Sequence, residues 1–149
     1  MPLLVCFDID GTLADVTHRV HYWRQTPKNW KMFKSEMVND PPIEPMCKLA
    51  RVMANSDQDV IVCSGRSEDT RAMTVAWLQK HGIKFEKLYM RAENDYRSDD
   101  IIKKELLDKI VDDWGKKPDI VFDDRPRVVK MWREYGVFVA DVYQGEEDF

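Results

Sequence analysis

The sequence contains little cysteine and no long hydrophobic run. Its three cysteines, Cys6, Cys47 and Cys63, are an odd number and form no CxxC pair. This argues against a disulfide framework and against a zinc site, and it is typical of a protein from a reducing cytoplasm. Apolar stretches span only a few residues, and Met1 and Pro2 lead into the first of them without a charged segment. We therefore expect a cytoplasmic protein with neither a membrane span nor a signal peptide.

Neither sign of charge dominates the composition. The 149 residues include 23 Lys and Arg against 27 Asp and Glu, for a formal net charge of -4, and 44% are hydrophobic. Such a composition argues against a disordered tail and against a uniformly basic nucleic-acid binder, so any contact with a polyanion must be local. The length predicts a single domain over residues 1–149 that buries roughly two-thirds of the surface of its unfolded chain.

Short apolar runs alternate with segments of helical spacing. The predicted parallel strands are residues 3–7, 60–63, 120–122 and 137–142, with 84–90 as a fifth candidate. The first four are continuously apolar, as expected for strands buried on both faces, and the fifth candidate is weaker. The predicted helices are residues 68–81, 100–114 and 127–135, each followed directly by a glycine. This alternation predicts an α/β fold, a doubly wound parallel sheet whose ligand crevice lies at the carboxyl ends of the strands.

Two of the predicted strands end in carboxylates. Asp8 and Asp10 follow the first strand two residues apart, so strand alternation sends both side chains to the same side. Asp123 and Asp124 follow the strand at 120–122. Because the carboxyl ends of parallel strands meet at one edge of the sheet, these acids converge and need a cation. Oxygen ligands of this kind suit Mg²⁺, so Asp8, Asp10, Asp123 and Asp124 are the candidate magnesium ligands.

Groups suited to a phosphate follow the second strand and begin a later helix. The run Ser64-Gly65-Arg66 offers a hydroxyl, a permissive backbone N–H and a guanidinium. Asp99 is expected to cap the helix at 100–114, with Lys103 four residues on and on the same face. A lysine in the first turn of a helix can neutralise a bound phosphate, and the spacing alone leaves Lys103 and Lys104 both open.

The order of these motifs resembles that of a known superfamily. The DxDGT run from Asp8, the Ser-Gly-Arg run, a later lysine and a final Asp-Asp resemble the four motifs of the haloacid dehalogenase (HAD) superfamily, whose members are mostly Mg²⁺-dependent phosphatases. Within it, residues 91–103, 123–125, 128–133 and 145–149 resemble the 3′-phosphatase half of phage polynucleotide kinase/phosphatase. Two departures stand out. No G-x-x-x-x-G-K-[ST] motif is present, so kinase activity is not expected, and residues 15–45 are longer than the corresponding insertion.

The resemblance implies a role for each motif residue. Asp8 is the implied nucleophile, which forms an aspartyl-phosphate, and Asp10 is the implied general acid and base. The implied phosphate- and substrate-binding residues are Thr12, Arg19, Ser64, Gly65, Arg66, Arg91, Asp99 and Lys103. Asp123 is implied to contact Mg²⁺, with Asp124 beside it. The resemblance also favours Lys103 over Lys104.

The implied double role of Asp10 sets a condition on its pKa. Asp10 must first protonate the leaving alkoxide and then activate water, so it must start protonated. Repulsion from Asp8, Asp123 and Asp124 predicts a raised pKa for Asp10, while Mg²⁺ would act in the opposite direction on its ligands.

Residues 15–45 fit the alternation poorly and predict a small cap insertion after the first strand. Between Asp15 and Glu36 they contain no acid and interleave basic and aromatic side chains: Arg19, Arg24, Lys28, Lys31 and Lys34 with Tyr22, Trp23, Trp30 and Phe33. This mixture suits single-stranded nucleic acid. Alternatively, Trp30, Phe33 and Met37 lie at i, i+3 and i+7 and pack one helix face onto the body. His18 and His21 are expected to be cap or surface residues, since a hard Mg²⁺ site does not need imidazole.

The leading functional prediction is a Mg²⁺-dependent phosphomonoesterase that removes 3′-phosphates from DNA or RNA ends. A separate kinase or ligase could supply the other steps of end repair, and no membrane partner is expected. A phosphatase of free nucleotides or of another small phosphorylated metabolite is the second hypothesis. The third is a receiver-type phosphoacceptor domain, which fits less well because the acidic pair of a receiver follows the first strand, whereas Asp123 and Asp124 follow a late one.

Overall fold

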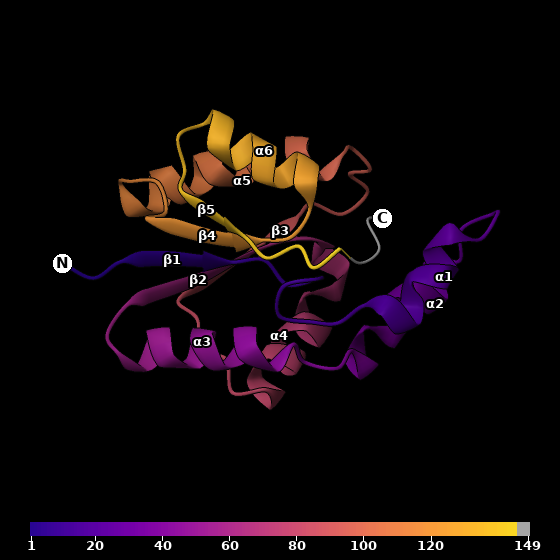
Figure 1. Ribbon diagram of the computed structural model, residues 1–149. Coiled ribbons are helices and arrows are strands. Elements are labelled where there is room, and N and C mark those ends of the chain that lie inside the picture. Colours follow the sequence, from indigo (N-terminus) through magenta and orange to yellow (C-terminus); the bar gives the residue numbers. More distant parts are fainter. Residues whose placement is uncertain (146–149) are drawn as a thin grey trace.

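The structure is a computed structural model that describes residues 1–145 (Figure 1). Residues 146–149, which belong to the closing segment used in the resemblance, lie outside the described part. Five strands form one parallel sheet in the order β3-β2-β1-β4-β5. They are β1 (Leu4–Phe7), β2 (Asp59–Ser67), β3 (Lys87–Arg91), β4 (Ile120–Asp123) and β5 (Val139–Asp141). Because β1 lies between β2 and β4, the residues that end these three strands meet at one edge of the sheet.

Helices cover both faces of the sheet (Figure 1). On one face lie α3 (Glu44–Asn55) and α4 (Arg71–Lys80), and on the other lie α5 (Asp99–Trp114) and α6 (Pro126–Glu134). Strand alternation divides the core accordingly: in β1, Leu4 and Cys6 belong to the cluster that includes α5 and α6, whereas Val5 and Phe7 belong to the cluster that includes α3 and α4. Burial on both faces explains the continuous apolar runs. The predicted doubly wound α/β fold is confirmed.

Some element boundaries differ from the predictions. Strand β2 continues to Ser67, so Ser64-Gly65-Arg66 lies within the strand and not after it, and its register with β3 shifts between Cys63 and Ser67. The helix predicted at 68–81 begins as the 3₁₀ turn η3 (Glu68–Thr70) before α4 starts. Helix α3 was not among the predicted helices, because its first residues were included in the insertion.

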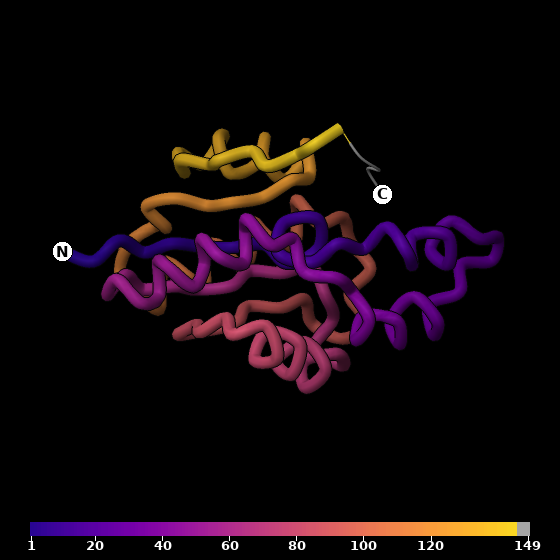
Figure 2. The backbone as a smooth tube through the Cα atoms, turned by 60° about the horizontal axis from the view of Figure 1, so that its bottom comes forward, coloured from indigo at the N-terminus to yellow at the C-terminus, as the bar shows by residue number. Residues whose placement is uncertain are grey.

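The segment between β1 and α3 forms a small helical projection. We call residues 15–43 the cap segment; it is two residues shorter than the predicted insertion because α3 begins at Glu44. Its elements are η1 (Thr17–Arg19), α1 (Val20–Arg24), α2 (Trp30–Ser35) and η2 (Glu36–Asn39). Figures 1 and 2 show α1 and α2 beyond the carboxyl ends of the strands. Within residues 1–145, no helix combines the length and the apolar character needed to cross a membrane.

Candidate active site

Asp8 directly follows β1 at the carboxyl edge of the sheet. Its backbone N–H donates to the carbonyl oxygen of Phe122 (3.0 Å), which continues the pairing with β4 and fixes its position. The Thr12 hydroxyl donates to Asp8 Oδ2 (3.1 Å), and the Lys103 ammonium donates to Oδ1 (2.8 Å). Both oxygens of this buried carboxylate therefore have a donor, and its orientation is set from two sides.

Lys103 connects Asp8 to Asp123. Its ammonium also donates to Asp123 Oδ2 (2.7 Å). Burial alone lowers the pKa of Lys103, but the charges of Asp123 and Asp8 outweigh burial and raise the pKa well above its usual value, so the lysine stays charged. Lys104, by contrast, pairs with Asp108 on the outer side of α5 (2.8 Å). The structure thus places Lys103, and not Lys104, among the strand-end acids.

Asp8, Asp123 and Asp124 form an acidic group at this edge. Each offers one carboxylate oxygen, and these three oxygens lie within 4.8 Å of one another. Asp123 is held by the indole N–H of Trp132 (3.2 Å) and by the backbone N–H of Asp124 (2.9 Å). Burial raises the pKa of Asp8 well above its usual range and that of Asp124 to about 6, and the charge of Asp123 adds to both shifts. Three carboxylates facing one ammonium leave negative charge that a divalent cation would offset.

The donor set of this acidic group fits Mg²⁺, which prefers carboxylate oxygens. Gly11 makes the approach of Asp124 sterically feasible: it adopts φ 83°, and a Cβ there would lie 2.0 Å from Asp124 Oδ2. Asp10, the fourth predicted magnesium ligand, lies outside the group, and its carboxylate faces two arginines instead. The geometry therefore supports a set of three carboxylates rather than four.

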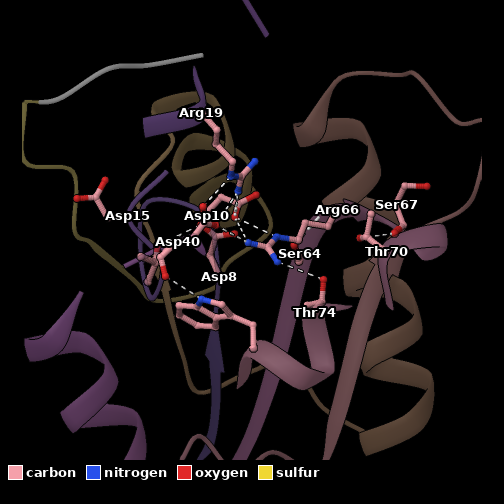
Figure 3. A network of polar contacts seen from close by, with 12 residues as sticks. Asp8, Asp10, Asp15, Arg19, Asp40, Ser64, Arg66, Ser67, Thr70 and Thr74 are labelled. Atoms are coloured by element: carbon pink, nitrogen blue, oxygen red, sulfur yellow. Dashed lines mark hydrogen bonds and ion pairs between the residues drawn. The ribbon is translucent and has the colours of Figure 1, made fainter. Parts of the chain in front are cut away.

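Two arginines hold the carboxylate of Asp10 (Figure 3). Arg66 donates from Nε (3.0 Å) and Nη2 (2.7 Å) to Asp10 Oδ1, and Arg19 donates from Nη2 to the same oxygen (3.0 Å). Burial alone raises the pKa of Asp10, but the charges of Arg66 and Arg19 outweigh burial and lower the pKa to about 2. The predicted rise in this pKa is therefore wrong, because guanidinium groups and not the other acids lie closest to the carboxylate.

Asp40, which the sequence did not single out, positions both arginines. Arg19 donates to both of its carboxylate oxygens (2.8 and 2.9 Å), Arg66 donates to Oδ2 (3.0 Å), and Nε2 of His18 lies 2.6 Å from Oδ1. The backbone carbonyl of Asp40 accepts from the indole N–H of Trp77 in α4 (2.9 Å). No sequence pattern marks Asp40, because all these partners lie at least 21 positions away along the chain. His18 thus pairs with a carboxylate.

Asp99 lies between two further arginines. Arg91 donates to its Oδ1, and Arg125, which the sequence did not identify as a site residue, donates to Oδ2 (2.6 Å). Arg91 also donates to the carbonyl oxygen of Gly65 (2.8 Å), and a Cβ on Gly65 would lie 2.9 Å from Asp99 Oδ1. The expected capping role of Asp99 is wrong: Ser98 occupies the N-cap position of α5, and no side chain caps that end.

These groups surround one cavity of about 630 Å³ at the carboxyl ends of the strands. The predicted site residues that line it are Asp8, Asp10, Gly65, Arg66, Arg91, Asp99, Lys103, Asp123 and Asp124. Thr12, Arg19 and Ser64 are buried and contact residues of this lining. Thr12 bonds Asp8, Arg19 bonds Asp10, and the hydroxyl of Ser64 accepts from the backbone N–H of Arg66 (3.1 Å).

A family model described as the phosphatase domain of the polynucleotide kinase PNKP matches residues 2–149 of the chain. The chain belongs to this family. It is a phosphatase domain of the HAD type, as the order of its motifs implied.

Several relatives of this chain are longer proteins. The "Putative bifunctional polynucleotide kinase/RNA ligase" of Autographa californica nuclear polyhedrosis virus is 34% identical over 136 residues, which are 89% of this chain and 18% of that protein. Two structures of a Pnkp1/Rnl/Hen1 complex, one described as an RNA repair complex, match with a TM-score of 0.82 at 33% and 32% identity. Each match covers 99% of this chain but only 48% and 44% of those chains, so the chain spans less than half the length of these relatives.

More distant proteins share the fold alone. A haloacid dehalogenase-like hydrolase from Streptococcus pneumoniae matches with a TM-score of 0.70 at 13% identity, over 94% of this chain and 84% of that chain.

Proposed function

We propose that this phosphatase domain removes 3′-phosphates from polynucleotide ends through an aspartyl-phosphate on Asp8. The observation that carries the proposal is the placement of Asp8, a buried carboxylate in the cavity wall that is oriented by Lys103 and Thr12 and lies beside Asp123 and Asp124. Membership of the PNKP phosphatase family supports a polynucleotide end as the substrate. A relative described as part of an RNA repair complex supports RNA ends among the substrates.

In the first step, an oxygen of Asp8 forms a bond to phosphorus while the bond from phosphorus to the 3′-oxygen breaks. Asp10 gives its proton to that departing oxygen, which becomes the 3′-hydroxyl. The Lys103 ammonium reduces the repulsion between the Asp8 carboxylate and the phosphate dianion. Arg66, which also lines the cavity, can disperse charge on the phosphoryl oxygens.

Substrate binding would prepare Asp10 for this step. Between Arg66 and Arg19 Asp10 is ionised, because these arginines lower its pKa to about 2. A bound phosphate dianion adds negative charge nearby and competes for the Arg66 guanidinium, and both changes raise the pKa of Asp10. In the second step the ionised Asp10 takes a proton from water, whose oxygen attacks phosphorus and releases phosphate from Asp8.

Asp8, Asp123 and Asp124 are the residues that would hold Mg²⁺. When bound, this ion would supply positive charge that reduces the repulsion between the Asp8 carboxylate and a phosphate. The hard oxygen donors, the excess of carboxylates over ammonium groups and the raised pKa values of Asp8 and Asp124 all support this assignment.

Further enzymes would act on the same ends. The chain covers only part of relatives whose names include a polynucleotide kinase and an RNA ligase. Removal of a 3′-phosphate leaves a 3′-hydroxyl, the end that a ligase joins. We infer that a kinase and a ligase, on this or another chain, act before or after this domain.

The test compares phosphate release, with Mg²⁺ present, from matched 3′- and 5′-phosphorylated oligonucleotides, the corresponding mononucleotides and an aryl phosphate. We expect the 3′-phosphorylated oligonucleotide to be the best substrate and EDTA to abolish release. Faster turnover of mononucleotides would instead favour a phosphatase of free nucleotides. No release from any substrate would favour the phosphoacceptor hypothesis.

Replacing the nucleophile tests the covalent step. We expect Asp8→Asn to lower kcat by at least about ten-thousandfold, because an amide cannot form the aspartyl-phosphate. Asp15→Asn is the matched control, since Asp15 follows the same strand but does not line the cavity. Melting temperatures would verify that both variants fold, and activity retained by Asp8→Asn would contradict the covalent mechanism.

A further inference from the structure

The cavity walls carry aromatic side chains that the chemistry above does not use. Trp30, in the cap segment, and Tyr96, in the loop between β3 and α5, both line the cavity that contains Asp8. Their side chains remain 43% and 80% exposed. Large rings left exposed beside a site are typical of surfaces that bind a ligand.

Some of the large apolar side chains of the cap segment are buried, and others are exposed. Phe33 and Met37 are 7% and 3% exposed, so they pack as the helical spacing predicted, but Trp30 does not. Trp30 meets Phe33 edge to face, with ring centroids 6.0 Å apart, and the guanidinium of Arg19 lies over Phe33 (4.6 Å to the centroid). The indole of Trp30 therefore contacts the Phe33 ring while it lines the cavity.

The loop that carries Tyr96 is held by ion pairs and backbone contacts. Arg91 donates to the carbonyl oxygens of Asp95 (3.1 Å) and Arg97 (2.5 Å). Arg97 pairs with the carboxylates of Asp95 (2.7 Å) and Glu105 (2.6 Å). An ordered loop presents the Tyr96 ring in place before a ligand arrives, which reduces the entropy lost on binding.

A third aromatic side chain, Trp23, is already occupied on one face. The ammonium of Lys28 lies 4.0 Å from its ring centroid, and both residues line the cavity. Lys28 is exposed, so it adds positive charge near the aromatic rings. Flat rings together with a cation match the two parts of a nucleotide, because the rings can stack on a base and the cation can face a phosphodiester.

We propose that Trp30 and Tyr96 form a stacking subsite for unpaired nucleobases near the terminal phosphate. The inference rests on the proposed function and identifies the residues that make the enzyme prefer a base-bearing polymer end to other phosphomonoesters. Stacking uses the face of a base and not its edges, so the subsite accepts all four bases. It discriminates against an end that lacks bases.

The experiment compares kcat/KM for two 3′-phosphorylated oligonucleotides, one intact and one with abasic residues at its last two positions, and for glycerol 2-phosphate. The wild-type protein should favour the intact oligonucleotide over the abasic one by about ten- to a hundredfold, the range that base stacking supplies. Trp30→Ala and Tyr96→Ala should each remove much of this preference by slowing the intact oligonucleotide alone. Trp30→Phe should retain most of it.

Phe138→Ala is the matched control, because Phe138 is 70% exposed but does not line the cavity, and it should leave all three rates unchanged. Equal wild-type rates on the two oligonucleotides would overturn the stacking subsite and leave the proposed function intact. Equal slowing of both oligonucleotides by Trp30→Ala would also overturn it, since that pattern indicates a purely structural role. Turnover of glycerol 2-phosphate with no release from either oligonucleotide would overturn the proposed function as well.

Discussion

The site has two halves, a sheet half and a cap half, which each contain four charged residues but differ in the ratio of carboxylates to cations. The sheet half comprises Asp8, Lys103, Asp123 and Asp124, and the cap half comprises Asp10, Arg19, Asp40 and Arg66. Carboxylates outnumber cations in the sheet half, whereas the two signs are equal in the cap half. Burial raises the pKa of Asp124 to about 6, and the charge of Asp123 adds to this rise. The charges of Arg66 and Arg19 outweigh burial at Asp10 and lower its pKa to about 2. The comparison shows that the sheet half has an excess of negative charge, which a cation would offset, whereas the arginines of the cap half keep Asp10 ionised.

Removing the lysine should disturb the sheet half most strongly. Lys103→Met leaves Asp8 and Asp123 without the ammonium that orients them, and we expect phosphate release to fall by about a thousandfold. Lys104→Met should leave the rate unchanged, because Lys104 forms an ion pair with Asp108 and does not line the cavity. Rates of phosphate release from a 3′-phosphorylated oligonucleotide measure both. Equal losses in the two variants would contradict the assignment of Lys103.

Removing the central carboxylate should disturb the cap half less severely. Asp40→Asn leaves Arg19 and Arg66 with one fewer charged partner while keeping the shape of the side chain. We expect the free energy of unfolding to fall by about 3 kcal/mol, because the variant leaves buried charge uncompensated. Misplacement of Arg66 should slow turnover by about a hundredfold. Urea unfolding and phosphate-release assays measure these changes.

The partly exposed partner of Asp40 provides a milder comparison. His18→Gln removes a contact from a side chain that is 31% exposed, so its effect on stability should be much smaller. A loss of stability as large as that of Asp40→Asn would contradict the central position of Asp40 in this cluster.

The excess of carboxylates in the sheet half should also make the free energy of unfolding depend on pH when divalent cations are removed. The pKa of Asp124 in the folded protein, about 6, lies above the usual value of 3.8. The contribution of Asp124 to stability is therefore fully present below pH 3.8 and is lost as the pH rises through about 6. In EDTA we expect the free energy of unfolding to fall by on the order of 2 kcal/mol between about pH 4 and pH 7. Asp124→Asn should reduce this fall, and Mg²⁺ should reverse it. Urea unfolding at each pH measures the effect, and an unchanged slope in the variant would contradict it.

The acids of the sheet half could be predicted from the sequence because they follow apolar strands directly, whereas only the family resemblance favoured Lys103 over Lys104. The position of a strand end in a parallel sheet determines where the next side chain lies, so Asp8 and Asp123 could be assigned without knowledge of their neighbours. Asp40 could not be found in this way, because its role depends on contacts with Arg19, Arg66 and Trp77, which lie far apart along the chain. The predicted direction of the pKa shift of Asp10 is wrong for the same reason, because the direction depends on which charged groups lie nearest to the carboxylate.

The cap segment illustrates a limit of periodic patterns. Spacing at i, i+3 and i+7 predicts one face only while the α-helix continues, and α2 ends at Ser35, where η2 follows. Phe33 and Met37 are still buried, but Trp30 is the first residue of α2 and extends toward the cavity. The packing hypothesis therefore holds for Phe33 and Met37 but not for Trp30.

Each half of the site accepts a hydrogen bond from the indole of one tryptophan, and the two tryptophans lie in the helical layers on opposite faces of the sheet. Trp132 in α6 donates to the Asp123 carboxylate, and Trp77 in α4 donates to the Asp40 carbonyl. Because indole fluorescence responds to its surroundings, each tryptophan is an internal optical probe of one layer. Two variants would each keep one of these tryptophans, with all the others replaced by phenylalanine. Mild denaturation of the two variants would reveal which layer loosens first, since local openings differ in free energy. Loss of activity could then be assigned to the half whose emission changes with it.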